Sequence, residues 1–313
     1  MRDLSIIIPG RNEEFFQKTI DNVLENIVAD TEIIAVCDGY FPKIDKNDRV
    51  TVIYNPEAKG QRQSTNQGAR YSLAKYIMKA DAHCAFSKGF DAEMIKSFEK
   101  DYVVLPRMYT LVAFKWICNG CFKEFDQGAK PVCDNCGSTD MDKRIVWEPN
   151  HRKKTDYMWF NSLMRVKYFD RNGLENADKK IYSHKYREWA KGDVTDVMCG
   201  IGACWLMERD WYWKIGGMDE NHGSWGQMGV ELGCKAWMSG GRHVVNKKAW
   251  FAHLFRTQKD FTWPYENKAN DQEKARVYSR DLWIRDRWIW KRSFKWLIEK
   301  FSPLYTWGNF GTI

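Results

Sequence analysis

The sequence predicts an α/β protein built on a mostly parallel, doubly wound sheet. Within residues 4–80, short apolar runs alternate four times with stretches typical of helices, which is the pattern of β-α-β units. Two of these runs lead into acidic residues, Asp38 and Asp81. A hydrophobic content of 44% in 313 residues is enough for a substantial core. Because ligands bind at the carboxyl ends of strands in such sheets, both acidic residues are candidates for a binding site.

The first half of the chain accounts for the parallel part of the sheet. The apolar run at residues 4–9 is typical of a buried parallel strand, and a helix follows with Phe16, Ile20 and Val23 on one face. The remaining elements of this half are expected as strands at residues 32–36, 50–54 and 76–78 and a helix over residues 62–74.

The second half departs from this alternation. Strands are expected at residues 103–114 and 144–147, on either side of a cysteine-rich insertion, at residues 200–207, and in a segment that ends at His253. Helices are expected at residues 209–215, through Glu231 and Trp237, and over residues 266–313. Residues 148–196 are polar and show no clear pattern.

Composition narrows the class of protein. The net charge of +8 is a modest basic excess, which is compatible with a polyanionic partner. No apolar run reaches the roughly 18 residues of a membrane span, and the first residues do not resemble a signal peptide. We therefore expect a soluble protein in the cytoplasm of a bacterium or of a phage-infected cell.

Asp81 and His83 form the first candidate metal site. Residues two apart in an extended chain point to the same side, so the carboxylate and the imidazole would lie next to each other. Together they offer two ligands for a divalent cation such as Mn²⁺ or Mg²⁺. The Asp-x-His pattern is common, however, and without further signals an ordinary surface pair is the better interpretation.

Four segments, in order, resemble the GT-A glycosyltransferases of family 2 and especially the polypeptide N-acetylgalactosaminyltransferases. Residues 6–13 are similar to the opening strand and Asn-Glu turn, and residues 81–84 (Asp-Ala-His-Cys) to the Asp-Ser-His-Cys metal motif. Residues 216–232, with Gly-Gly-Met-Asp-Glu and Trp-Gly, and residues 253–256 (His-Leu-Phe-Arg) match two later elements. Each segment alone is weak, but four in the right order are specific. They span residues 5–265, apart from the cysteine insertion and residues 148–196.

The resemblance implies a GT-A fold, a UDP-sugar donor and a catalytic Mn²⁺ or Mg²⁺. Asp81, His83 and His253 would bind the metal, which stabilises the charge on the leaving diphosphate. Glu231 matches a family carboxylate and is assigned to the catalytic set, either directly or as a residue that orients its neighbours. Residues 257–264 have the position of a closing lid. The residues that would bind the donor are Pro9, Asn12, Glu13, Asp38, Arg62, Asp81, Gly200, Gly202, Trp225 and Arg256.

Simpler interpretations of single residues remain. His253 could be an ordinary histidine at a strand end, and Asp38 could cap a turn with Gly39. Trp225 could belong to the core, and Arg256 could be a surface charge.

The sequence departs from the family at one important position. Inverting family 2 enzymes carry a Glu-Asp pair whose Asp is the general base, and the matching positions here are Met228 and Gly229. Neither side chain accepts a proton. The retaining N-acetylgalactosaminyltransferases also lack that Asp, so the chain favours retention. It lacks their sugar-contacting Glu as well, which leaves the donor sugar open.

Two Cys-x-x-Cys pairs lie in the insertion. Cys118, Cys121, Cys133 and Cys136 supply four thiolates, the ligand set of a structural Zn²⁺. This zinc ribbon is not part of the family pattern. It would either bind nucleic acid or protein, or simply stabilise a long loop.

The C-terminal stretch alternates basic and aromatic residues. Arg285 and Arg292 would contact phosphates and Trp288 and Trp290 would stack on bases if the stretch binds nucleic acid. An amphipathic helix that packs its aromatic side chains on the catalytic domain explains the same pattern equally well. Attachment to anionic lipid is a third interpretation.

Taken together, these patterns predict a GT-A domain in two halves, residues 1–113 and 144–265, with a zinc-ribbon insertion at 114–143 and a helical tail at 266–313. The leading acceptor hypothesis is a hydroxymethylated pyrimidine in DNA, as in bacteriophage genome modification. A polysaccharide, a lipid-linked glycan or a protein is the alternative acceptor. A non-catalytic zinc protein that binds nucleic acid is the alternative from another class. The oligomeric state stays open.

Overall fold

The computed structural model describes residues 2–128, 130–168, 191–256, 269–285, 287–288, 291–302, 304 and 307. The expected lid at residues 257–264 and the expected base contact of Trp290 lie outside these residues. Within the described part of the chain, no helix has both the length and the apolar character that crossing a membrane requires.

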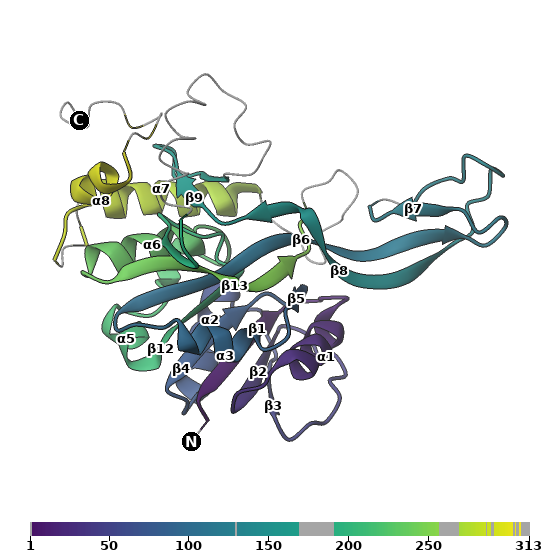
Figure 1. Ribbon diagram of the computed structural model, residues 1–313, viewed down its shortest axis with the longest axis horizontal. Helices are drawn as coiled ribbons and strands as arrows, with labels where there is room; N and C mark the ends of the chain where they lie inside the picture. Colours follow the sequence, from purple (N-terminus) through teal and green to yellow (C-terminus); the bar gives the residue numbers. More distant parts are fainter. Residues whose placement is uncertain are drawn as a thin grey trace.

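One mixed sheet organises the domain, with the strand order β11-β13-β6-β12-β4-β1-β2-β3 (Figure 1). Its N-terminal part is parallel: β1 pairs with β2 and β4, and β2 pairs with β3. These strands are β1 (Leu4–Gly10), β2 (Thr31–Asp38), β3 (Val50–Asn55) and β4 (Tyr76–Ala80). The four predicted strands and the two predicted helices of this half are therefore confirmed, but the fourfold alternation is not, because no helix lies between β2 and β3.

The second half makes the sheet mixed. β12 (Cys204–Glu208) lies antiparallel between β4 and β6, whereas β13 (Arg242–His253) runs parallel to β6. The strand expected at residues 200–207 starts only at Cys204, because Gly202 has a left-handed backbone (φ of 84°) that ends extended structure. Residues 200–203 form a loop at the carboxyl edge of the parallel strands instead.

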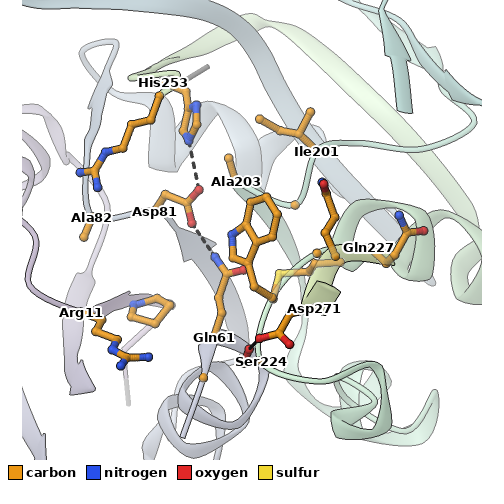
Figure 2. A pocket seen from close by; sticks show the side chains of 18 of the residues that line it. Arg11, Gln61, Asp81, Ala82, Ile201, Ala203, Ser224, Gln227, His253 and Asp271 are labelled. Atoms are coloured by element: carbon orange, nitrogen blue, oxygen red, sulfur yellow. Dashed lines mark hydrogen bonds and ion pairs between the residues drawn. The ribbon is translucent and has the colours of Figure 1, made fainter. Parts of the chain in front are cut away.

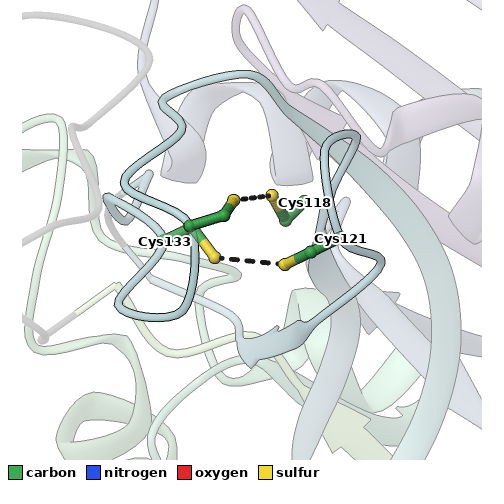
Figure 3. A group of neighbouring side chains, drawn as sticks. Cys118, Cys121 and Cys133 are labelled. Atoms are coloured by element: carbon green, nitrogen blue, oxygen red, sulfur yellow. Dashed lines mark hydrogen bonds between the residues drawn. The ribbon is translucent and has the colours of Figure 1, made fainter.

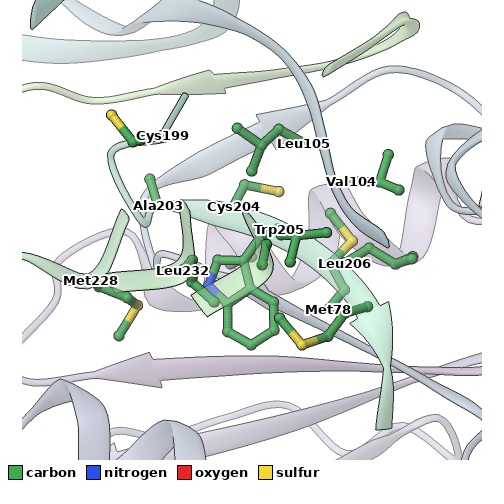
Figure 4. Packing of buried hydrophobic residues seen from close by; sticks show 14 of the residues in the cluster. Met78, Val104, Leu105, Cys199, Ala203, Cys204, Trp205, Leu206, Met228 and Leu232 are labelled. Carbon is green, nitrogen blue, oxygen red and sulfur yellow. The ribbon is translucent and has the colours of Figure 1, made fainter. Parts of the chain in front are cut away.

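The helices pack on both sides of this sheet and around its end. They are α1 (Phe16–Asn26), α2 (Gln61–Tyr71), α3 (Phe90–Lys96), α5 (Arg209–Lys214), the short 3-10 helix η1 (Glu220–His222), α6 (Met228–Met238), α7 (Ala269–Ile284) and α8 (Phe294–Phe301). Every residue of α6 is buried. In Figure 4, Leu232 of α6 packs with Trp205 of β12 and Met78 of β4, so the core fixes α6 against the strands that carry the site.

A long hairpin projects from the body (Figure 1). It consists of β6 (Tyr102–Cys118) and β8 (Met141–Thr155), which are antiparallel from Met108–Thr155 to Cys118–Met141. Both strands are longer than the sequence predicts, and the cysteine insertion with β7 (Glu124–Asp126) closes the far end. The remaining short strands are β5 (Cys84–Phe86), β9 (Met158–Phe160), β10 (Val166–Tyr168) and β11 (Val194–Asp196).

Candidate active site

A pocket of about 830 Å³ lies at the carboxyl ends of the parallel strands (Figure 2). Its lining combines the end of β1, the start of α2, the residues after β4, the 201–203 loop, residues 224–228, the end of β13 and the first turns of α7. Its position is the one expected for a ligand in a sheet of this kind.

Asp81, His83 and His253 meet in this pocket. Antiparallel pairing of β13 with β5 places His253 opposite Cys84, next to the Asp81–His83 segment. The Nε2 atom of His253 lies 3.1 Å from Asp81 Oδ2 and 3.1 Å from His83 Nε2. One carboxylate oxygen and two imidazole nitrogens are a chemically reasonable donor set for Mn²⁺, so the three residues fit the expected metal.

Burial and neighbouring charges keep His253 and Asp81 in the form that binds metal. Burial lowers the pKa of His253 to about 4, so its imidazole is neutral at pH 7. Burial opposes ionisation of Asp81, but the Lys79 ammonium and the hydrogen bond with His253 hold the pKa of Asp81 far below its usual range. Both residues are therefore deprotonated at neutral pH, as metal ligands must be.

Lys79 and Gln61 fix the Asp81 carboxylate from behind. Lys79 is fully buried, and its ammonium donates to Asp81 Oδ1 and, at 2.9 Å, to the carbonyl of Gly202. The Gln61 amide donates to the same carboxylate oxygen at 2.8 Å. The sequence interpretation missed both residues, although a lysine inside the apolar run at 76–80 was a usable signal.

Glu13 connects His83 to Arg256. Its Oε2 atom accepts a hydrogen bond from the Arg256 guanidinium and lies 3.4 Å from His83 Nδ1. Burial raises the pKa of Glu13, but His83 and Arg256 outweigh that effect and lower it. A carboxylate at the second nitrogen of a metal-binding histidine orients the ring, so Glu13 is placed to support His83.

Several expected donor-binding residues line the pocket. Pro9, Gly202 and Trp225 do so, and Asp38 lies at the end of β2. The Asp38 carboxylate accepts backbone hydrogen bonds from Lys59 at 2.7 Å and Gly60 at 2.9 Å, which fixes the turn before α2.

Comparisons with known proteins relate this chain to glycosyltransferases. Residues 5–116 match the family described as "Glycosyl transferase family 2". "Polypeptide N-acetylgalactosaminyltransferase 3" of Drosophila melanogaster is 29% identical over 204 residues, which cover 63% of this chain and 24% of that protein. "N-acetylgalactosaminyltransferase 7" of Mus musculus is 22% identical over 213 residues, covering 68% and 27%. The chain spans about a third or less of the length of the curated relatives it matches.

A solved structure extends the likeness to most of the chain. The crystal structure of GalNAc-T7 with UDP, GalNAc and Mn²⁺ superimposes with a TM-score of 0.60 over 91% of this chain and 49% of that one, at 17% sequence identity. The fold is GT-A. The predicted fold class and the predicted resemblance to family 2 and to the polypeptide N-acetylgalactosaminyltransferases are thus confirmed.

Two predicted donor contacts in the GT-A domain need correction. Asn12 is exposed and does not line the pocket. Gly200 does not line it either, because its backbone packs against the start of α6, where the Gly200 N–H donates to the carbonyl of Gly229 at 3.4 Å.

Glu231 and Arg62 are the larger correction. The expected catalytic carboxylate and the expected donor contact form an ion pair of 3.1 Å with side chains 0% and 1% exposed, and neither lines the pocket. Lys235 pairs with Glu231 at 2.8 Å. Burial opposes ionisation of Glu231, but Lys235 and Arg62 lower its pKa to about 2. The pair is structural, because Arg62 donates to the carbonyl of Gly226 and thereby holds the segment that carries Trp225.

The missing general base has a steric explanation. A Cβ atom at Gly229 would lie 1.9 Å from the carbonyl oxygen of Gly200, so no carboxylate side chain fits there. Met228 lines the pocket but cannot take a proton. The absence of an acidic residue at position 229 is therefore a consequence of the close packing of the 200–203 loop on α6.

Two of the expected nucleic-acid contacts in the C-terminal stretch, Arg292 and Trp288, have partners within the protein. Arg292 donates to the carbonyls of Trp237 at 3.3 Å and Gly241 at 3.4 Å, and Trp288 packs against the core with Lys235 over its ring at 4.9 Å. Arg285 is exposed and paired with Asp281. Arg292 and Trp288 thus attach the tail to the GT-A domain, and the alternative of aromatic packing describes this region.

The four cysteines of the insertion come together at the end of the hairpin. Figure 3 shows Cys118, Cys121 and Cys133 of this group. Their Sγ atoms all lie within 4.8 Å of one another, with Cys118–Cys136 and Cys121–Cys133 both at 3.5 Å, and none forms a disulfide. Four thiolates around a tetrahedral Zn²⁺ with bonds of about 2.3 Å would lie about 3.8 Å apart. The donor set and the spacing both fit zinc.

Proposed function

We propose that this chain is a metal-dependent glycosyltransferase that moves a sugar from a UDP-sugar to an acceptor hydroxyl. The observation that supports the proposal best is the meeting of Asp81, His83 and His253 in one pocket at the carboxyl edge of a GT-A sheet. The similar fold of GalNAc-T7, whose crystal structure contains UDP and Mn²⁺, supports the same donor and metal.

The metal would be held by the Asp81 carboxylate and the two imidazoles, and it would supply Lewis-acid stabilisation of the leaving diphosphate. Other residues of the chain position the ligands and supply positive charge. Lys79 and Gln61 hold the Asp81 carboxylate in place. Arg256 presents a cationic donor fork at the same end of the pocket.

The stereochemical outcome is proposed to be retention. A carboxylate general base at the family position is excluded, because Gly229 packs on the carbonyl of Gly200. Product analysis by NMR of the anomeric proton tests this directly. Inversion at the anomeric carbon would require a base elsewhere in the pocket.

The test of the proposed activity is metal-dependent release of UDP from UDP-sugars without an added acceptor. Wild-type protein with Mn²⁺ is expected to release UDP, and chelator is expected to stop the release. If no UDP-sugar of a broad panel is bound or hydrolysed in Mn²⁺ or Mg²⁺, the proposal fails.

For the acceptor we propose a hydroxymethylated pyrimidine in DNA, with the reaction in the cytoplasm. The net charge of +8 and the basic residues around the pocket support a polyanion. The names of the curated relatives point to a protein acceptor instead. Incubation with labelled donor and hydroxymethylated DNA, plain DNA and Ser/Thr peptides separates the two, because only one acceptor should become labelled.

We also propose that the cysteine cluster binds one structural Zn²⁺. Four thiolates at the end of an exposed hairpin have no core large enough to fold around, and a metal supplies that stabilisation. Metal analysis of the purified chain should find about one zinc per molecule.

A further inference from the structure

A second group of charged side chains lines the pocket away from the metal triad. Arg165 and Lys167 come from β10 and the turn before it, and Lys274 and Arg276 come from α7. Asp271 is the acidic lining residue on the same two elements. We call Arg165, Lys167, Lys274 and Arg276 the mouth cations. Figure 2 shows Asp271 beside Ser224, on the side of the pocket opposite His253.

The donor diphosphate does not account for the mouth cations. Its charge would be met at the other end of the pocket, by the metal at Asp81, His83 and His253 and by Arg256. Four further cations on β10 and α7 stand against two carboxylates, the lining Asp271 and Glu273, which is ion-paired with Arg276. The remaining net charge of +2 creates a positive field in this part of the pocket.

Three polar contacts attach α7 to residues 219–224, and the one between Ser279 and His222 is buried. The Tyr278 hydroxyl donates to Asp219 at 2.9 Å, and the Ser279 hydroxyl lies 2.8 Å from His222 Nε2. Ser224 donates to Asp271 at 3.3 Å. Because Asp219 also donates its backbone N–H to Glu231 at 2.6 Å, α7 is attached to the same buried network that holds residues 223–226. Lys274 and Arg276 therefore lie on a helix that these contacts attach to the GT-A domain, and such preorganisation favours binding.

We propose that the mouth cations bind the phosphodiester groups that flank the acceptor nucleotide of a DNA strand. The inference rests on the proposed function, and it moves the phosphate contacts from the tail residues to β10 and α7. A hydroxymethyl group must reach the floor of the pocket near Asp81, so the nucleotide has to leave the stack and enter alone. Its two neighbouring phosphates then lie at the rim, where Arg165, Lys167 and Lys274 stand exposed to solvent.

The experiment measures binding of a fluorescent single-stranded oligonucleotide that carries one hydroxymethyluracil, with UDP and Mn²⁺ present, over a series of salt concentrations. Each phosphate contact to a single strand contributes about 0.7 to the slope of log K against log salt, which is about fivefold in affinity at 0.1 M salt. Lys167→Ala and Lys274→Ala are each expected to lose about one such increment. Lys295→Ala is the matched control, since Lys295 is an exposed lysine on α8 that does not line the pocket.

A second arm neutralises the DNA instead of the protein. An oligonucleotide with methylphosphonates on both sides of the hydroxymethyluracil should bind wild-type protein more weakly, and Lys274→Ala should then add little further loss. Equal loss for the matched control, or full additivity of the two changes, overturns the inference.

The outcomes separate this inference from the proposed function. If UDP release depends on metal but the oligonucleotide does not bind, or if a peptide is labelled instead, the phosphate subsite is wrong and the glycosyltransferase proposal stands. If UDP release is absent as well, the proposed function fails with it. UDP release without acceptor is also measured for Lys295→Ala, where an unchanged rate shows that this control variant is folded.

Discussion

The part of the pocket formed by Asp81, His83 and His253, here called the metal edge, and the C-terminal helices use similar residue types for different purposes. At the metal edge, polar and charged side chains from β4, the residues after it and β13 converge on one point, and His253 is only 9% exposed. In and around α7 and α8, several cations form ion pairs, as Arg285 does with Asp281 and Arg276 with Glu273, while Trp283 and Phe294 are buried in the core. Charged and aromatic residues in sequence therefore indicate a site only when their side chains converge, and otherwise they attach one element to another.

The largest expected effect is at the metal edge. His253→Ala removes one of three protein ligands, so Mn²⁺-dependent UDP release should fall by at least about a hundredfold. The loss should come with weaker Mn²⁺ binding by titration calorimetry and with little change in zinc content. Undiminished UDP release in the variant would remove His253 from the metal site.

Lys79 is not a proposed metal ligand but the buried partner of Asp81, so replacing it tests whether residues behind the ligands belong to the metal site. Lys79→Met leaves the Asp81 carboxylate without its buried partner, which should cost about 3 kcal/mol of unfolding free energy. Because Mn²⁺ can then take the place of the ammonium charge, added Mn²⁺ should raise the melting temperature more in the variant than in the wild type. Equal stabilisation of both proteins by Mn²⁺ would show that Lys79 does not act on the metal site.

The end of the hairpin is a third region, where four cysteine side chains lie together and are expected to stabilise the hairpin by binding zinc. Cys133→Ser should release the zinc and loosen the far part of β6 and β8, at a cost of about 2 kcal/mol or more to that segment. Hydrogen exchange should rise there and stay low in β1, β2 and β4. Metal analysis that finds no zinc in the wild type contradicts the assignment.

The smallest effect is expected in the tail. Arg292→Ala loses two hydrogen bonds to carbonyls and its position 4.3 Å over the Trp296 ring, which together should cost about 1–2 kcal/mol. Thermal unfolding measures this loss, with Lys295→Ala as the control of equal charge. Weaker DNA binding without any loss of stability would restore the assignment of Arg292 to nucleic acid that the sequence pattern suggests.

The sequence by itself determined the parts of the protein that depend on short-range patterns. Apolar runs alternating with helical stretches fixed the parallel strands β1 to β4, because burial on both faces of a strand leaves a continuous signature. Spacing of two residues fixed the Asp81–His83 pair, and two Cys-x-x-Cys pairs fixed the cysteine cluster.

Only the tertiary structure decided the remaining roles, because they depend on contacts between distant residues. The sequence alone assigns Glu231 to the catalytic set, but in the structure Glu231 is buried against its partner Arg62, 169 positions away. Gly229 excludes a carboxylate because the carbonyl of Gly200 occupies the space. Lys274 lines the pocket because Tyr278 and Ser279 contact Asp219 and His222, which lie 59 and 57 positions earlier in the chain. Local periodicity reports which side of an element is buried, but not which element buries it.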